Sequence, residues 1–210
     1  MRITAIRPTK HGNVAVEADG AFLCAVQPDA WVASGLSVGD ALDEAALAAL
    51  QSRSEFAAAR KKALALLSAR CYPRRILIER LMRTVSAEAA EAAADRMEEL
   101  GLLNDADYAL RYAQELAENR SYAARRIRLE LSKKGLDRAA IEDALAALED
   151  RDDTAAAVAL LERRYRVLST PVEIRRAAAL LERCDYSGDV IRTAIHAVRR
   201  LGEDIPDETL

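Results

Sequence analysis

Residues 70–81 have the sequence RCYPRRILIERL, and residues 120–131 have the sequence RSYAARRIRLEL. Shifting the first segment by fifty positions, without a gap, brings identical residues onto one another. The identical pairs are Arg70 and Arg120, Tyr72 and Tyr122, Arg75 and Arg125, and Leu81 and Leu131. A further shift of fifty aligns Arg175, Arg176 and Leu181 with Arg125, Arg126 and Leu131. Recurrence at such a period is typical of stacked supersecondary units, so the sequence predicts three tandem helical repeats.

Each repeat is predicted to contain three helices. In the second repeat we expect them at about 105–118, 122–134 and 138–149, with Gly135 as a left-handed C-cap and Asp137 as an N-cap. Other residues suited to open, cap or end helices are Pro73, Gly101, Asn119, Pro171 and Ser187. On each middle helix, two apolar residues at positions i and i+4 share one face and form the predicted core. These pairs are Leu77 and Leu81, Ile127 and Leu131, and Ala177 and Leu181.

The N-terminal segment has a different pattern. Apolar residues alternate with polar ones from Ile3 to Val26, which is the period of half-buried strands, and Asp19-Gly20 is a hairpin signal. The expected strands are residues 2–7, 13–18 and 21–26, and the expected short helices are residues 28–34 and 40–54. Because three strands alone are only marginally stable, the sheet is expected to pack on a helix.

The predicted fold class is mainly α: three tandem three-helix repeats of about fifty residues, preceded by a small three-stranded antiparallel β element with short helices. Five parts of the chain follow from these patterns. They are an N-terminal β-hairpin and helix extension at 1–56, helical repeats at 57–106, 107–154 and 155–202, and an acidic C-terminal tail at 203–210.

The composition argues against several classes of protein. The chain has 31 Lys and Arg against 34 Asp and Glu, and the net charge of −3 disfavours a general nucleic-acid binder. It contains no apolar run long enough to span a membrane and no visible secretory signal, so we expect a cytoplasmic protein. Its three cysteines and two histidines have no metal-site spacing, and no nucleotide-binding or hydrolase motif occurs. We therefore expect no cofactor, no bound metal and no enzymatic activity.

Basic residues gather around the middle helix of each repeat. Because Arg125 lies about 160° from Ile127 on a helical wheel, it should point away from the apolar face. If the repeats stack regularly, equivalent arginines form a stripe suited to phosphates or to an acidic protein groove. Alternatively, these side chains are the solvated faces of amphipathic helices. The residues that we expect to bind are Arg70, Arg74, Arg75, Arg120, Arg125, Arg126, Arg128, Lys133 and Lys134.

Two tyrosines, Tyr72 and Tyr122, begin equivalent middle helices beside these arginines. Aromatic rings next to basic residues can stack on the bases of single-stranded nucleic acid. The low aromatic content, 4%, instead favours rings that pack where two repeats meet.

Several short motifs, in their order and spacing, resemble the RecX family of bacterial recombination regulators. The motifs are GLLND at 101–105 with Tyr108-Ala109, RSYAARRI at 120–127 and KKGL at 133–136. The resemblance extends over residues 57–150 and, more loosely, over 151–200, and the N-terminal segment looks like the extension that some members carry. The third repeat departs from the pattern, because Thr170 and Asp185 replace the arginine and the glycine of the second repeat.

The resemblance implies three successive three-helix repeats in an elongated, curved molecule, which we expect to be a monomer. It implies a regulator that binds the RecA filament on single-stranded DNA and inhibits ATP hydrolysis, strand exchange and LexA coprotease activity. Such a protein modulates recombination, DNA repair and the SOS response, and it uses no catalytic residue. Two other functions remain open from the residues: a sequence-neutral DNA-binding protein, with DNA bound directly, and a helical-repeat scaffold for another protein.

Overall fold

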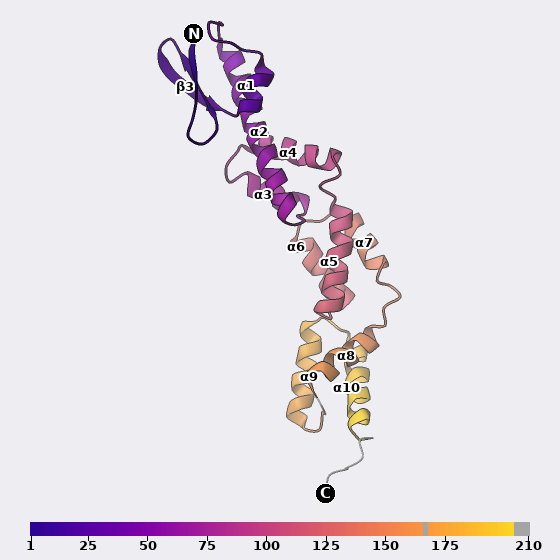
Figure 1. Cartoon of the computed structure of the whole chain (residues 1–210). Helices are drawn as coiled ribbons and strands as arrows, with labels where there is room; N and C mark the ends of the chain where they lie inside the picture. Colours follow the sequence, from indigo (N-terminus) through magenta and orange to yellow (C-terminus); the bar gives the residue numbers. More distant parts are fainter. Residues whose placement is uncertain (166–167, 204–210) are drawn as a thin grey trace. The chain divides into compact units, whose positions relative to one another are not determined.

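The computed structural model describes residues 1–165 and 168–203, with side chains described up to Arg199. The described chain forms two compact units, Met1–Asn104 and the part that begins at Asp105 (Figure 1). Most of it is helical, and a small three-stranded antiparallel sheet precedes the helices, so the predicted fold class is confirmed. The predicted acidic tail, residues 203–210, lies outside the described residues from residue 204 onward.

The first unit begins with an antiparallel sheet in which the second strand lies between the other two. The strands are β1 (Ile3–Pro8), β2 (Val14–Ala18) and β3 (Ala21–Val26). Asp19 and Gly20 have φ angles of 49° and 81°, and two consecutive residues with positive φ make the turn whose twist suits a hairpin. The predicted strands and their connecting turn are confirmed.

The inner face of the sheet packs on two helices, as the marginal stability of three strands requires. Helix α1 (Pro28–Ser34) agrees with its predicted range and ends at Gly35, whose φ of 68° makes it a left-handed cap. The core beneath the sheet is continuous from the strands to α1 and α2 (Glu44–Ala69). Its buried members are Ile3, Val16, Val26, Trp31, Leu42 and Leu50.

Helix α2 corrects one prediction, because the helix expected at 40–54 does not end there. Asp43 caps α2 by accepting a hydrogen bond from the Ala46 N–H, and the helix then continues to Ala69. No glycine or proline occurs between residues 44 and 69, and the many alanines and leucines favour helix throughout. The predicted limit between the first two parts of the chain, at 56/57, therefore falls inside a helix, and the repeat limits stay a prediction.

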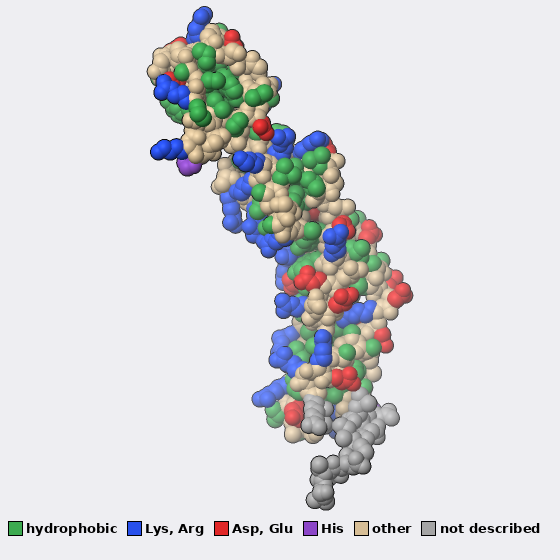
Figure 2. All heavy atoms as spheres, viewed as in Figure 1, with side chains coloured by type: hydrophobic (Ala, Val, Ile, Leu, Met, Phe, Trp, Pro, Cys, Tyr) green, Lys and Arg blue, Asp and Glu red, His purple; other side chains and the backbone are tan. Residues whose placement is uncertain are grey.

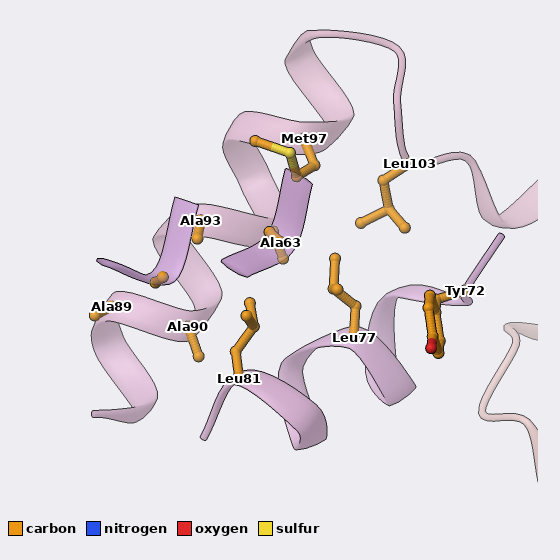
Figure 3. Packing of buried hydrophobic residues seen from close by; sticks show 11 residues of the cluster. Ala63, Tyr72, Leu77, Leu81, Ala89, Ala90, Ala93, Met97 and Leu103 are labelled. Atoms are coloured by element: carbon orange, nitrogen blue, oxygen red, sulfur yellow. The ribbon is translucent and has the colours of Figure 1, made fainter. Parts of the chain in front are cut away.

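Helices α2, α3 (Arg74–Leu81) and α4 (Ala87–Glu99) form the helical group of the first unit. Leu77 and Leu81 point from α3 into a core that also contains Ala63 of α2 and Ala90 of α4, and both are fully buried (Figure 3). Alanines on α4 leave room for these leucines, and burial of the pair contributes about 3–6 kcal/mol before entropy is counted. The predicted core pair is confirmed.

The second unit contains two further groups of three helices. They are α5 (Asp105–Asn119), α6 (Ala124–Lys133) and α7 (Arg138–Ala146), then α8 (Asp153–Arg164), α9 (Pro171–Arg183) and α10 (Gly188–Glu203). The core pairs on α6 and α9 are completely buried, as predicted. Helix α6 begins two residues later than expected, because Ser121 has a positive φ of 52° and Ala123 is extended. No described helix has both the length and the apolar character needed to cross a membrane.

A candidate basic binding surface

Lys and Arg side chains gather along one side of each unit, over α3 in the first and over α6 and α9 in the second (Figure 2). The nine predicted binding residues lie on or beside α3 and α6. The structure divides them into three sets. Some hold acids of their own unit, some lie against tyrosine rings, and others are exposed.

Arg74 and Arg75 of α3 hold acidic side chains. The Arg74 guanidinium contacts Asp95 at 2.6 Å and Glu98 at 3.0 Å, both on α4, and its side chain is 30% exposed. Arg75 pairs with Glu79, one turn away, at 3.6 Å. Arg74 therefore joins α3 to α4 within the unit, which a helical wheel of α3 alone could not reveal.

Three basic residues of the second predicted repeat are also ion-paired. Arg126 and Lys133 contact the same carboxylate, Glu130, at 2.9 Å and 3.0 Å. Arg128 contacts Glu142 of α7 at 2.8 Å. The hydrogen bond from Arg128 holds the pKa of the Glu142 carboxyl below its usual value, so this pair is charged at neutral pH. Exposed pairs of this kind add little stability, but they partly neutralise the cation that they hold.

The two tyrosines are packed rather than open for stacking. The Tyr72 ring is 7% exposed, with the guanidinium carbons of Arg70 and Arg80 at 4.6 Å and 5.1 Å from its centroid. Tyr122 packs against the apolar cores of both helical groups of the second unit, and Arg126 lies 5.4 Å from its ring. Packing where two repeats meet is therefore confirmed for Tyr122. The burial of Tyr72 leaves no accessible face for a base.

The remaining predicted residues differ in exposure. Lys134 lies 5.3 Å from the ring of Tyr112 and is half-buried. Arg120 and Arg125 are exposed, and within the described residues neither makes a hydrogen bond, an ion pair or a ring contact. Since Ile127 is fully buried while Arg125 is exposed, the predicted direction of Arg125, away from the apolar face, is confirmed.

Two arginines outside the predicted set have the same character. Arg175 and Arg176, in the second turn of α9, are exposed and form no ion pair within the described part of the chain. The nearby Glu173 is engaged in the helix cap, and its hydrogen bonds with Thr170 hold its pKa below the usual value. The fifty-residue alignment with Arg125 and Arg126 is the sequence signal that points to these two arginines. We call Arg120, Arg125, Arg175 and Arg176 the free-arginine surface.

The segment before α6 joins the two helical groups of the second unit. The Ala123 N–H donates to the carbonyl of Cys184 at 3.0 Å. Arg151 donates to the Tyr122 carbonyl at 2.8 Å and to the Tyr186 hydroxyl at 2.9 Å. Burial raises the pKa of Tyr186 to about 12, so this hydroxyl keeps its proton. These bonds connect α6 with the turn after α9.

Ser121 adds a second connection between the same groups. Its hydroxyl accepts a hydrogen bond of 2.7 Å from Arg163 of α8, and the serine is 4% exposed. Ser121 has a left-handed backbone conformation, with a φ of 52°. Both connections cross between the groups. Helices α6 and α9, which carry Arg125 and Arg175 near their N-terminal ends, therefore belong to one packed body.

The described residues include three free thiols and a surface of exposed basic side chains. No group of three or more His, Cys, Asp or Glu that could hold a metal ion occurs in this part of the chain. The three cysteines are free thiols: Cys71 is exposed, Cys24 is half-buried and Cys184 is buried. Burial raises the pKa of Cys24 and of Cys184. What the surface offers is fixed positive charge that attracts phosphates or carboxylates.

Comparison with known families places the chain among helical regulators. The family model described as RecX, second three-helix domain, matches residues 104–145, which include α5, α6 and nearly all of α7. The regulatory protein RecX of Streptomyces coelicolor is 34% identical over 151 residues, which cover 70% of this chain and 80% of that protein. The regulatory protein RecX of Xanthomonas axonopodis pv. citri is 38% identical over 141 residues, covering 64% of this chain and 83% of that protein.

Two solved structures share the fold. A crystal structure of regulatory protein RecX has a TM-score of 0.68 at 23% identity, and the match covers 93% of this chain and 98% of that one. The crystal structure of RecX from Lactobacillus salivarius has a TM-score of 0.58 at 24% identity, covering 69% of this chain and 96% of the other.

Proposed function

The chain belongs to the RecX family of regulatory proteins, and from this we propose that it binds the RecA filament on single-stranded DNA and inhibits RecA. The inhibited activities are ATP hydrolysis, strand exchange and LexA coprotease activity. The protein acts by binding, without a cofactor and without a catalytic step of its own. Through RecA it modulates recombination, DNA repair and the SOS response.

The observation that carries this proposal is the free-arginine surface of the second unit. Four exposed guanidinium groups that form no ion pair within the described residues occur on two consecutive helical groups, and Arg125 and Arg175 occupy matching positions of the fifty-residue repeat. Repeated cations on a packed body suit a ligand that is itself repetitive and anionic, and a nucleoprotein filament has both properties. Because the net charge is −3, attraction to an anionic ligand has to come from local groups of cations and not from the charge of the whole molecule.

Other predicted residues contribute in different ways. Arg70 lies against the Tyr72 ring, four residues before α3 begins. Arg74, Arg75, Arg126, Arg128 and Lys133 each hold an acid, so we expect each of them to add less to filament binding than a free-arginine residue adds. Lys134, beside a ring, is expected to behave like this second group.

A second candidate function is sequence-neutral binding to DNA without RecA. Exposed arginines on three-helix groups favour it, because they can neutralise phosphates without reading bases. This alternative predicts tight, steeply salt-dependent binding to naked DNA. A scaffold for an unrelated protein would show neither DNA binding nor an effect on RecA.

The test is the single-strand-dependent ATPase of RecA during a titration with this protein, repeated with excess free DNA. Inhibition at well below one molecule per RecA, unaffected by added DNA, supports filament regulation. Inhibition that free DNA abolishes would favour the DNA-binding alternative. Absence of any inhibition would contradict the proposal.

Matched variants connect the effect to the surface. Reversing Arg125 and Arg175 to glutamate should weaken filament binding by at least about tenfold, because each reversal replaces an attraction with a repulsion. Reversing Arg126 would be less informative, since it also breaks the contacts with Glu130 and Tyr122. Arg111→Glu is the control for each single reversal, because it changes the net charge by the same amount and Arg111 is 66% exposed on α5, where it pairs with Asp107. Equal weakening by the control would indicate a general charge effect and would remove the special role of the surface.

A further inference from the structure

The N-terminal sheet has two edge strands, and their unpaired backbone groups differ in how far other residues cover them. In a sheet, half of the backbone N–H and C=O groups of an edge strand point away from its neighbour and remain unpaired. Natural proteins cover such an edge or protect it with charged residues and proline. The two edges of this sheet are β1 and β3.

The edge at β1 is covered and protected. The Ile3 N–H donates to the Asp40 carbonyl at 3.0 Å, the Gly39 N–H donates to the Ile3 carbonyl at 2.8 Å, and the Leu42 N–H donates to the Met1 carbonyl at 2.8 Å. Residues 39–42 thus cover the start of the strand. Its other end carries charged Arg7 and then Pro8, which has no N–H to offer.

The edge at β3 has neither kind of protection. Within the described residues, no backbone group from Ala21 to Val26 makes a hydrogen bond beyond β2. The strand, AFLCAV, contains no charged residue and no proline. Phe22 is 67% exposed, and Ala25, also exposed, leaves space along the same strand. A row of unpaired donors and acceptors beside an exposed phenyl ring is complementary to another extended polypeptide.

The size of this edge indicates which polypeptide it receives. A strand of six residues buries much less than the roughly 1,200 Å² that a stable interface between two independent molecules needs. A second copy held only through β3 would therefore dissociate readily. A partner that is already bound at another surface needs only a small second contact, because its effective concentration is high.

We propose that the open edge of β3 adds a strand from the protein subunits of the bound filament, with Phe22 as its apolar anchor. This inference rests on the proposed function, which supplies the first contact through the basic surface. The added segment is extended and uncharged where it borders β3, because β3 offers no charge to pair with. The N-terminal extension is then a second contact surface for the filament, distinct from the arginines.

The first test compares Phe22→Lys with Val32→Lys in binding to RecA filaments assembled on single-stranded DNA. Val32, on α1, is 78% exposed, so the control makes the same chemical change on the same unit but away from the sheet. Phe22→Lys should weaken binding about fivefold or more, as expected for loss of an apolar anchor, and Val32→Lys should not. Trp31 fluorescence verifies the fold of the unit in both variants, and Ala25→Lys provides a second alteration of the strand.

Amide hydrogen exchange tests the backbone contact directly. The amides of residues 21–26 that point away from β2 should become protected when the wild-type chain binds filaments, while those of α1 do not change. Unchanged exchange in β3, or equal binding by the Phe22 and Val32 variants, would overturn the strand-addition proposal and leave filament binding intact. A concentration-dependent dimer of the free protein that Phe22→Lys abolishes would assign the edge to a second copy instead. If the wild-type chain does not bind filaments, that result contradicts both the proposed function and this inference.

Discussion

Segments 70–81 and 120–131 have identical residues at four matching positions but different surroundings. In the second segment, Ser121 is buried and accepts a hydrogen bond from Arg163. The matching residue of the first segment, Cys71, is exposed. Tyr122 packs against two cores, whereas Tyr72 packs into one. Equal sequence positions therefore acquire different structural roles, because the neighbouring group decides what each side chain contacts.

Pro73 and Ala123, which occupy the same position in the two segments, show this difference in their backbone hydrogen bonds. Pro73 has φ −71° and ψ 151°, and Ala123 has φ −70° and ψ 159°, so both have the same extended conformation before a helix. Ala123 uses its N–H to bind the Cys184 carbonyl. Pro73 has no N–H and cannot make the equivalent bond. A conserved backbone shape thus does not imply a conserved connection.

The largest expected effect comes from the residue that joins the groups of the second unit. Arg151→Met removes the hydrogen bonds to the Tyr122 carbonyl and the Tyr186 hydroxyl, and we expect a loss of about 2–4 kcal/mol in the free energy of unfolding. Urea denaturation followed by circular dichroism measures this loss, and Trp31 fluorescence follows the first unit separately. Arg111→Met, which breaks an exposed pair, should change stability by less than about 0.5 kcal/mol. Similar losses in both variants would mean that the Arg151 contacts do not join the groups.

The next effect contrasts Ser121 with Cys71. Ser121→Ala deletes the acceptor of the Arg163 hydrogen bond in a buried position, and it should cost about 1–2 kcal/mol. Cys71→Ala changes an exposed side chain and should stay within about 0.5 kcal/mol. Thermal unfolding of the two variants under one buffer condition gives the comparison. A larger loss of stability in Cys71→Ala than in Ser121→Ala would contradict the view that only the second segment uses this position to join two helical groups.

Exchanging alanine and proline at positions 123 and 73 tests how much one backbone N–H group contributes to stability. Ala123→Pro keeps the backbone angles and removes the donor to Cys184, a loss of about 1 kcal/mol that the stiffer unfolded chain partly offsets. The reverse change, Pro73→Ala, restores an N–H in the first segment and only loosens the unfolded chain, so it should destabilise by about 0.5 kcal/mol. The expected net effect of Ala123→Pro is also about 0.5 kcal/mol. The two variants differ in hydrogen exchange, because only Ala123→Pro should speed exchange in the turn after α9 and at the start of α10. Unchanged exchange there would show that the bond is dispensable.

Much of this architecture could be predicted from the residues, for identifiable reasons. Alternation and the Asp19-Gly20 turn predicted the sheet, and the i, i+4 pairs predicted the cores, because both signals are local. The prediction that a helix ends near residue 54 was wrong, because no glycine, proline or capping residue there stops the helix. The extent of α2 is decided by an uninterrupted run of helix-forming residues, and a change of pattern along the chain does not require a break in the helix.

The binding surface was less predictable than the fold. A helical wheel gives the direction of Arg125 correctly, because direction follows from one helix. It cannot reveal that Arg74 meets Asp95 or that Arg128 meets Glu142, since those acids come from other helices brought close by packing. For the same reason Arg175 and Arg176 are absent from the predicted set: that both are exposed and form no ion pair within the described residues emerges only once α9 and its neighbours are placed.

The smallest expected effect tests whether an ion-paired arginine can be returned to the binding surface. Arg128 stands where the first segment has Ile78, so only the second segment has this cation. The pKa of Glu142 is lowered, so its carboxylate contributes to folding above its unfolded-state pKa, and that contribution is lost as pH falls through the lower folded-state value. At neutral pH the pair is intact, and only a substitution releases Arg128.

Glu142→Gln should therefore raise affinity for RecA filaments by about twofold and steepen the salt dependence of binding by up to about one unit of slope. Glu91→Gln is the matched control, because it removes the same charge from α4, where no arginine corresponds to Arg128. Fluorescence anisotropy of labelled single-stranded DNA coated with RecA, followed over a range of salt concentrations, measures both quantities. If both variants bind more tightly to the same degree, the gain reflects net charge alone. A gain confined to Glu142→Gln would show that Glu142 neutralises Arg128 and that Arg128, which has no counterpart in the first segment, binds the filament once it is released.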